Sequence, residues 1–116
     1  MKILTILNDA PYGSERSYNG LRLALSLAKR ADVEQRIFLI ADAVGCGRAG
    51  QTTPNGYYNI ERMIRSLLAA GVAIGACGSC MDARGLLESD LTAGCHRSSM
   101  NELTDWTIWA DKVVTW

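Results

Sequence analysis

Nearly continuous apolar runs constrain the fold of this chain more than any other feature. Residues 2–7 read KILTIL and residues 36–41 read RIFLIA. A strand with one face in water alternates apolar and polar residues, whereas a strand covered on both faces reads as an apolar run. We therefore predict buried strands in a sheet that helices cover on both sides.

The segments between these runs change to a helical period. In residues 17–28 the apolar side chains that share one helix face are Leu21, Ala24, Leu25 and Ala28. Asn59 is a typical N-cap for a second helix, and Gly71 is a typical stop. The apolar face of that helix comprises Ile60, Met63, Ile64, Leu67 and Leu68. Strands that alternate with helices predict a mostly parallel sheet.

The C-terminal part carries weaker signals. Residues 93–97 suggest a short edge strand, and residues 112–116 suggest a terminal strand. Between them, Ser99 and Glu102 form a capping-box pattern that opens a helix reaching about Ala110. A length of 116 residues suits a single α/β domain spanning residues 1–116.

Composition and charge exclude several classes of protein. Twelve basic and twelve acidic residues give a net charge of zero, and neither sign forms a block, so no nucleic-acid partner is expected. No apolar run approaches the roughly 18 residues that span a bilayer, and the start of the chain does not resemble a signal peptide. We therefore expect a cytoplasmic protein whose cysteines stay reduced.

Cys77 and Cys80 form a CxxC pair directly after a third apolar segment, residues 71–74. A thiol between a strand and a following helix meets the positive end of the helix dipole, which lowers its pKa. We predict that Cys77 is the more reactive of the two thiols, because it lies nearest the end of the strand. Asp82 and Arg84 follow within about one helical turn.

The carboxyl ends of parallel strands gather binding sites at one edge of a sheet. This rule brings the CxxC segment close to the turns after the first two strands. We expect Ser14, Asp42, Gly50 and Gln51 to line a shared cleft. Residues 45–56 contain four glycines and a proline, which predicts one long flexible loop beside it.

Four chemistries fit such a site to different degrees. Thioredoxin-like redox chemistry would place the CxxC after an earlier strand. A zinc site would use Cys77, Cys80, Cys95 and His96, but adjacent residues of an extended chain point to opposite sides. His96 is expected to be a surface or loop residue.

Nucleotide binding would use residues 10–17, which lack both the P-loop and the GxGxxG pattern. Sulfur transfer needs an exposed thiolate near a helix dipole or an arginine, and Cys77 meets that description. Cys80 would then either resolve a persulfide through a disulfide or simply pack.

Seven ordered segments carry a more specific signal than any single motif. They are residues 10–15, 21–24, 38–44, 50–51, 56–60, 77–85 and 110–114. On these segments the chain resembles the DsrE/DsrF-like proteins, most closely the small YchN-like branch, over essentially its whole length.

The resemblance implies a three-layer α/β sandwich with a mostly parallel five-stranded sheet, assembled as trimers or hexamers. Relatives in this superfamily serve sulfur oxidation and the sulfur relay to tRNA thiolation through a cysteine persulfide. Cys77 matches the relay cysteine, and the residues that match the YchN-like pattern are Cys80, Asp82, Arg84 and Gly85. Cys46 and Cys95 inherit no role. Because the resemblance ties Arg84 to the motif, we expect its charge to outweigh that of Asp82 at the Cys77 thiolate.

The resulting hypothesis is a cytoplasmic homo-oligomer that carries sulfur on Cys77 and passes it between a donor and an acceptor protein, without a cofactor or a metal. The last predicted helix supports assembly, because Ile108 and Trp109 point away from its inward face. The alternative is a non-catalytic oligomeric binding module whose CxxC is structural or metal-binding. The sequence leaves open whether the chain is an enzyme, such as a sulfurtransferase-like carrier.

Overall fold

All five strands run parallel in a single sheet. A computed structural model describes residues 1–54, 56 and 58–116; Asn55 and Tyr57, which belong to the predicted loop and to one matched segment, lie outside these residues. The strands are β1 (Lys2–Leu7), β2 (Glu34–Leu39), β3 (Ala73–Cys77), β4 (His96–Ser98) and β5 (Lys112–Thr115). Their order across the sheet is β4-β3-β2-β1-β5, with every neighbouring pair parallel.

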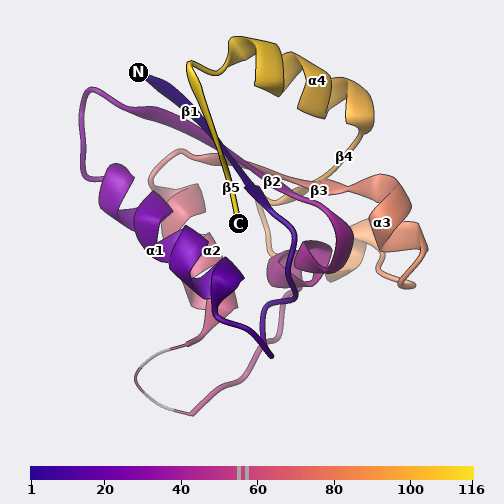
Figure 1. Cartoon of the computed structure of the whole chain (residues 1–116). Helices are drawn as coiled ribbons and strands as arrows, with labels where there is room; N and C mark the ends of the chain where they lie inside the picture. The colour runs from indigo at the N-terminus through magenta and orange to yellow at the C-terminus, as the bar shows by residue number, and fades with distance from the viewer. Residues whose placement is uncertain (55, 57) are drawn as a thin grey trace.

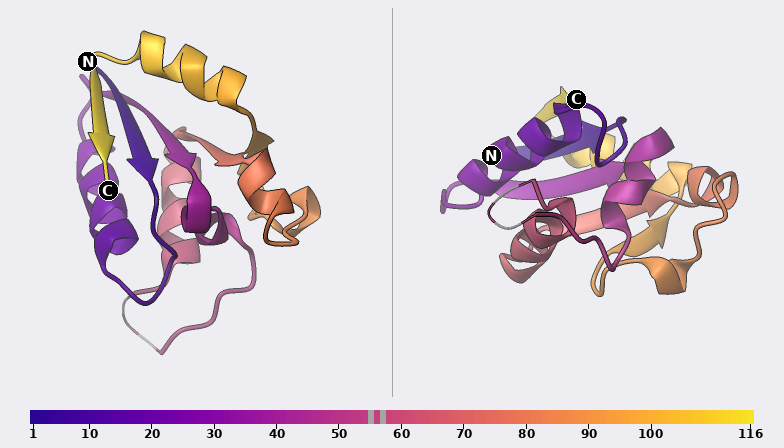
Figure 2. Two further views of the ribbon diagram at one scale, coloured as in Figure 1. Left: turned by 45° about the vertical axis from the view of Figure 1, so that its right-hand side comes forward. Right: turned by 90° about the horizontal axis from the view of Figure 1, so that it is seen from below.

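Helices cover both faces of this sheet, as the apolar strands require. Helices α1 (Arg16–Leu27) and α2 (Ile60–Ala69) lie on one face, and α4 (Met100–Trp109) lies on the other (Figures 1 and 2). The short helix α3 (Gly78–Asp82) continues directly from β3, and two 3-10 helices, η1 (Ala41–Gly47) and η2 (Glu88–Asp90), complete the chain. The predicted three-layer α/β class is confirmed, and the sheet is wholly rather than mostly parallel.

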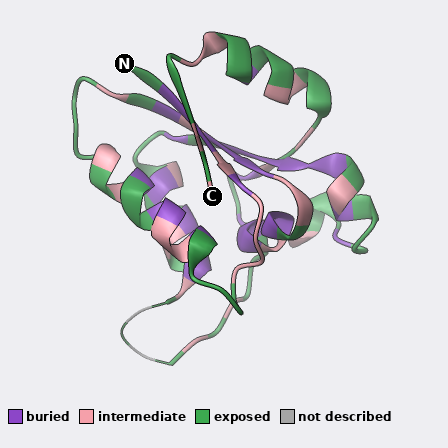
Figure 3. Cartoon of the chain, viewed as in Figure 1, coloured by how far each residue is buried: buried purple, intermediate pink, exposed green. Residues whose placement is uncertain are grey.

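The hydrophobic core forms on both sides of the central strands (Figure 3). Ile64 and Leu67 of α2 are fully buried, in agreement with the predicted apolar face. On the other side, the ring of Phe38 meets that of Trp106 edge to face, with 6.3 Å between centroids. In the described residues, no helix is both long and apolar enough to cross a membrane.

Both predicted N-caps are found in the structure, but the predicted capping box at the second helix is incomplete. The Asn59 side chain accepts a hydrogen bond from the backbone N–H of Arg62 at 3.0 Å, so this N-cap is confirmed. Ser99 likewise caps α4 by accepting from the N–H of Glu102 at 3.2 Å. The reciprocal half of the predicted capping box is wrong, because the Glu102 carboxylate binds Ser98 and His96 instead. His96 is accordingly a half-buried strand residue rather than a loop residue.

The predicted loop over residues 45–56 is shorter than expected. Its first three residues belong to η1, where Cys46 and Gly47 are buried. A side chain at position 47 would lie 3.1 Å from the sulfur of Cys95 and 3.3 Å from Leu91. Gly47 therefore lies in a closely packed place and not in a flexible loop, a difference that composition alone does not show.

Candidate functional site at the CxxC segment

Cys77 lies where the chain changes from strand to helix. It is the last residue of β3 and the N-cap of α3, and it pairs in register with Ser98 of β4. The first backbone N–H groups of a helix have no partner within the helix and attract negative charge. The fold thus places a thiol directly at a group of unpaired donors.

The surroundings of Cys77 favour its thiolate. Burial alone would raise its pKa, but hydrogen bonds from the Ser79 hydroxyl, the backbone N–H groups of Cys80 and Ser79 and the Cys80 thiol outweigh that effect and lower the pKa below its usual value. The Sγ of Cys77 lies 3.3 Å from the Oγ of Ser79. These donors are local, so they form together with α3.

The surroundings of Cys80 have the opposite effect. Burial and the donation of its proton to Cys77 raise the pKa of the Cys80 thiol, although the N–H of Ala41 and the charge of Arg84 partly offset this. The Ala41 N–H donates to Cys80 Sγ across 3.3 Å. The pair therefore has a defined order of ionisation, with Cys77 first.

Ala41, whose N–H makes this contact, has a strained backbone conformation. Its φ of 53° lies in the left-handed region, where a residue with a side chain is disfavoured by about 1–2 kcal/mol. Such strain persists where the surrounding structure imposes it and is frequent at functional sites. Nothing in the sequence at Ala41 signals this role, because alanine does not favour a positive φ.

Arg84 and Asp42 form an ion pair beside Cys80. The guanidinium donates to Asp42 Oδ1 at 2.7 and 2.9 Å and to the carbonyl of Cys80 at 3.0 Å. Arg84 therefore acts on Cys80 and ties α3 to η1, whereas we expected it to act on Cys77. The pair borders a hollow of about 170 Å³ lined by Ala10, Asp42, Val44, Gly45, Arg48, Arg84 and Leu86.

Asp82 also has an arginine partner, which sequence reasoning missed. Arg97 of β4 donates to both carboxylate oxygens of Asp82, at 2.8 and 2.9 Å. This contact holds the pKa of Asp82 below its usual range. The sheet order could have signalled Arg97, because a β4 strand beside β3 places residue 97 opposite Ala76.

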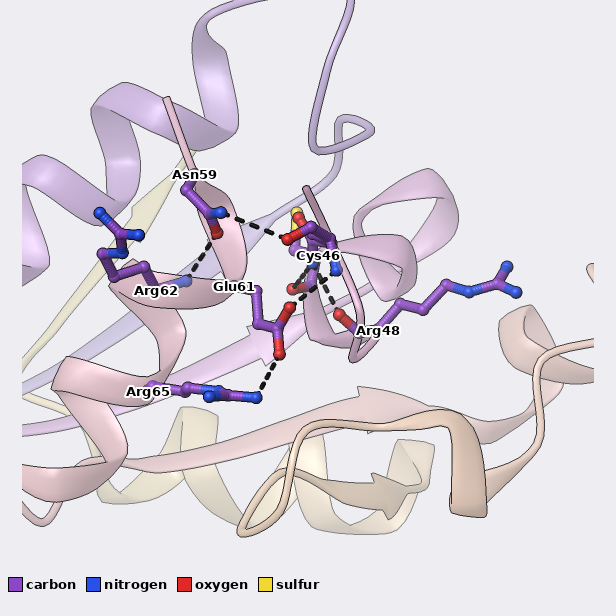
Figure 4. A network of polar contacts seen from close by, with 7 residues as sticks. Cys46, Arg48, Asn59, Glu61, Arg62 and Arg65 are labelled. Carbon is purple, nitrogen blue, oxygen red and sulfur yellow. Dashed lines mark hydrogen bonds and ion pairs between the residues drawn. The ribbon is translucent and has the colours of Figure 1, made fainter. Parts of the chain in front are cut away.

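The other predicted cleft residues lie in separate contacts. Ser14 Oγ donates to the carboxylate of Asp9 at 2.8 Å, so its place in a cleft with Cys77 stays a prediction. Gly50 and Gln51 line a hollow of about 280 Å³ together with α2 residues. There the Gln51 N–H donates to Glu61, which also accepts from Arg65 (Figure 4).

The exposure of the thiols differs from the expectation. Cys77 is only 4% exposed, because it ends an interior strand and α3 follows at once, whereas Cys80 is half-buried and Ser79 is exposed. The expectation that the Cys77 thiol is exposed is therefore wrong, because the thiol is nearly buried in the folded chain.

The remaining cysteines are poor nucleophiles. Burial raises the pKa of both Cys46 and Cys95 to about 12. Within residues 1–54, 56 and 58–116, no group of three or more His, Cys, Asp or Glu side chains could hold a metal ion. The four ligands considered for zinc thus do not converge in this part of the chain.

Comparisons with known proteins agree with this architecture. The sequence profile of the DsrE/DsrF-like family matches residues 1–116. The chain belongs to the DsrE/DsrF-like family.

Individual relatives of this DsrE/DsrF-like chain match it along nearly their whole length. Protein YchN of Escherichia coli is 42% identical over 115 residues, which cover 98% of this chain and 97% of the relative. Protein MK0008 of Methanopyrus kandleri is 37% identical over 112 residues, covering 97% and 91%. The crystal structure of the Escherichia coli ychN protein superposes with a TM-score of 0.94 at 41% identity, covering 100% of this chain and 99% of that one. The predicted family resemblance is confirmed, and the family is linked to sulfur relay.

Removing the Ser79 hydroxyl should weaken the Cys77 thiolate. We expect Ser79→Ala to lower the rate of Cys77 alkylation by iodoacetamide at neutral pH about 3- to 10-fold, as loss of one hydrogen bond to a charged group implies. The rate is read by mass spectrometry of the Cys77 peptide. Ser66→Ala is the matched control. Ser66 is also an exposed serine, but it lies on α2, so its loss should leave the rate unchanged. Equal rates for Ser79→Ala and the parent chain would contradict the assignment of this donor.

Proposed function

We propose that this chain carries sulfur as a persulfide on Cys77 within a sulfur relay. One observation supports the proposal above all: Cys77 is the N-cap of α3 with donors that lower its pKa, while the pKa of Cys80 is raised. The thiolate is the nucleophilic form of cysteine, so the two thiols differ in reactivity at neutral pH. The family's link to sulfur relay supplies the reaction class.

The loading step is a transfer between sulfur atoms. The Cys77 thiolate attacks the outer sulfur of a donor persulfide, R–S–SH. The donor's sulfur–sulfur bond breaks, and Cys77–S–SH and R–S⁻ form. No net oxidation occurs, because one sulfur–sulfur bond replaces another. Attack on the outer sulfur by an acceptor thiolate reverses the step and unloads the carrier.

Cys80 provides a second way to unload. It lies three residues after Cys77, about one helical turn away, and its thiol helps to lower the pKa of Cys77, so the two side chains are neighbours. Attack by the Cys80 thiolate there forms a Cys77–Cys80 disulfide and releases the outer sulfur as hydrosulfide. A thiol reductant then restores the pair. We expect this step to occur when no acceptor thiol is bound.

The proposal includes a homo-oligomer, either a trimer or a hexamer, in the cytoplasm, where thiols stay reduced. Ile108 of α4 is 80% exposed, and Val113 on the edge strand β5 is 45% exposed. Members of the family are known to oligomerise. The ring of Trp109 also has a contact within the chain, because the Arg36 guanidinium lies 4.0 Å from its centre. Trp116 packs within the chain on Gly20.

Loading by a sulfur donor tests the carrier function. After incubation with a cysteine desulfurase and cysteine, we expect the intact mass to increase by one sulfur atom, with the added atom on the Cys77 peptide. Cys77→Ser should abolish this increase, whereas Cys80→Ser should preserve it and prolong its lifetime. Cys46→Ser is the control and should load like the parent chain. Absence of added sulfur in the parent chain, or zinc in the purified protein, would favour the non-catalytic binding module.

Light scattering with size-exclusion chromatography tests the assembly. We expect a mass of three or six chains of 12.6 kDa each. Ile108→Asp should lower that mass if α4 lies in the interface, because a buried unpaired carboxylate is unfavourable. The exposed Leu87→Asp is the control. A parent chain that remains a monomer at every concentration would contradict the proposal.

A further inference from the structure

Arg97 lies unusually close to the backbone that follows Cys77. A side chain built on Gly78 would place its Cβ 2.8 Å from both Cζ and Nε of Arg97 and 2.9 Å from its Nη2. Arg97 also pairs in register with Ala76. The backbone of Arg97 thus lies beside Ala76, and its guanidinium occupies the space that glycine leaves at position 78.

Asp82 holds the guanidinium in this place. Its two carboxylate oxygens accept from Arg97 at 2.8 and 2.9 Å, which fixes the plane of the guanidinium group. The carboxylate side chain is 66% exposed, whereas the arginine side chain is 38% exposed. Water therefore screens the negative charge more strongly than the positive charge, which lies against the start of α3.

We propose that Arg97 is the cation that stabilises negative charge on the Cys77 sulfur, with Asp82 as the residue that positions it and Gly78 as the residue that admits it. For the free thiolate this inference stands alone, and for the persulfide anion it rests on the proposed function. The charge on Cys77 in turn raises the pKa of Arg97, together with the larger effect of Asp82. The other cation of the motif, Arg84, is engaged by Asp42 on the side of Cys80.

Two acidic groups also lie near the site. Glu88 of η2 acts on Arg97 and helps to raise its pKa. Glu102 of α4 approaches from the side of β4, where it accepts from Ser98 and contacts His96. Ser98 is the residue opposite Cys77. Arg97 is therefore the positive charge that the described residues place next to the α3 start, beside the helix amides themselves.

Four variants separate this electrostatic role from a structural one. The measurement is the pH profile of Cys77 alkylation by iodoacetamide, followed on the Cys77 peptide, in the reduced full chain without any sulfur donor. We expect Arg97→Met to slow alkylation at neutral pH about 3- to 10-fold and to move the profile to higher pH. Arg97→Lys should recover part of this loss.

Gly78→Ala tests the position of the charge without removing it. Alanine favours a helix more than glycine does, and the atoms it would meet belong to the flexible end of Arg97, so the chain should fold. We expect the new Cβ to displace the guanidinium and to slow alkylation as Arg97→Met does. Asp82→Asn removes the partner that positions the guanidinium but also removes a negative charge. These effects oppose each other, so it should slow alkylation less than Arg97→Met does.

The outcomes distinguish the two roles. If the ion pair were only structural, Asp82→Asn would slow alkylation as much as Arg97→Met, and that result would overturn the proposal. An unchanged pH profile in both Arg97→Met and Gly78→Ala would overturn it as well. Arg65→Met, which breaks the distant pair with Glu61, is the control for loss of a surface arginine. Thermal unfolding of each variant reports whether the fold is kept. Because no persulfide is involved, this experiment and the loading experiment can fail independently.

Discussion

The short helix α3 depends on contacts from outside itself. A helix of five residues is too short to be stable alone, since nucleating a helix costs more free energy than its few hydrogen bonds return. Two ion pairs connect it to its neighbours. Arg84, which follows α3, binds both the carbonyl of Cys80 and Asp42 of η1, and Asp82 of α3 binds Arg97 of β4. The donors that surround Cys77 belong to this helix, so the chemistry of the site depends on the same two contacts.

Opposing effects of similar size decide which thiol ionises. Burial penalises a charged sulfur at both cysteines, and it is the largest single effect on each pKa. At Cys77 several hydrogen bonds exceed this penalty, whereas at Cys80 the N–H of Ala41 and the charge of Arg84 do not. A difference of 1.36 kcal/mol between two protonation states corresponds to one pKa unit, so one or two hydrogen bonds suffice to set the order.

The sequence predicts the architecture well because burial on both faces of a strand leaves a direct mark on composition. The runs at residues 2–7 and 36–41, the Asn59 cap and the apolar face of α2 all have local causes, and each is found in the structure. Cys77 at the end of a strand is a local feature of the same kind. The start of the predicted loop fails because Gly47 serves packing against Cys95, a residue distant in sequence.

The partners within the site are harder to predict because they depend on tertiary contacts. Arg97 is 20 positions after Cys77 and becomes its neighbour only when β4 pairs with β3. The left-handed conformation of Ala41 has no signal in the sequence. Arg84 lies beside Cys80 and not Cys77 because the fold places its partner Asp42 there. The low exposure of Cys77 likewise follows from packing and not from residue type.

The order in which the two thiols ionise can be measured without changing the chain. Carbon NMR of cysteine-labelled protein follows the Cβ signal of each thiol as pH is raised. Ionisation of Cys77 first predicts that the Cys77 signal shifts at lower pH than the Cys80 signal, while those of Cys46 and Cys95 stay constant until far more alkaline conditions. A Cys80 signal that shifts first, or two signals that shift together with those of the buried cysteines, would contradict it.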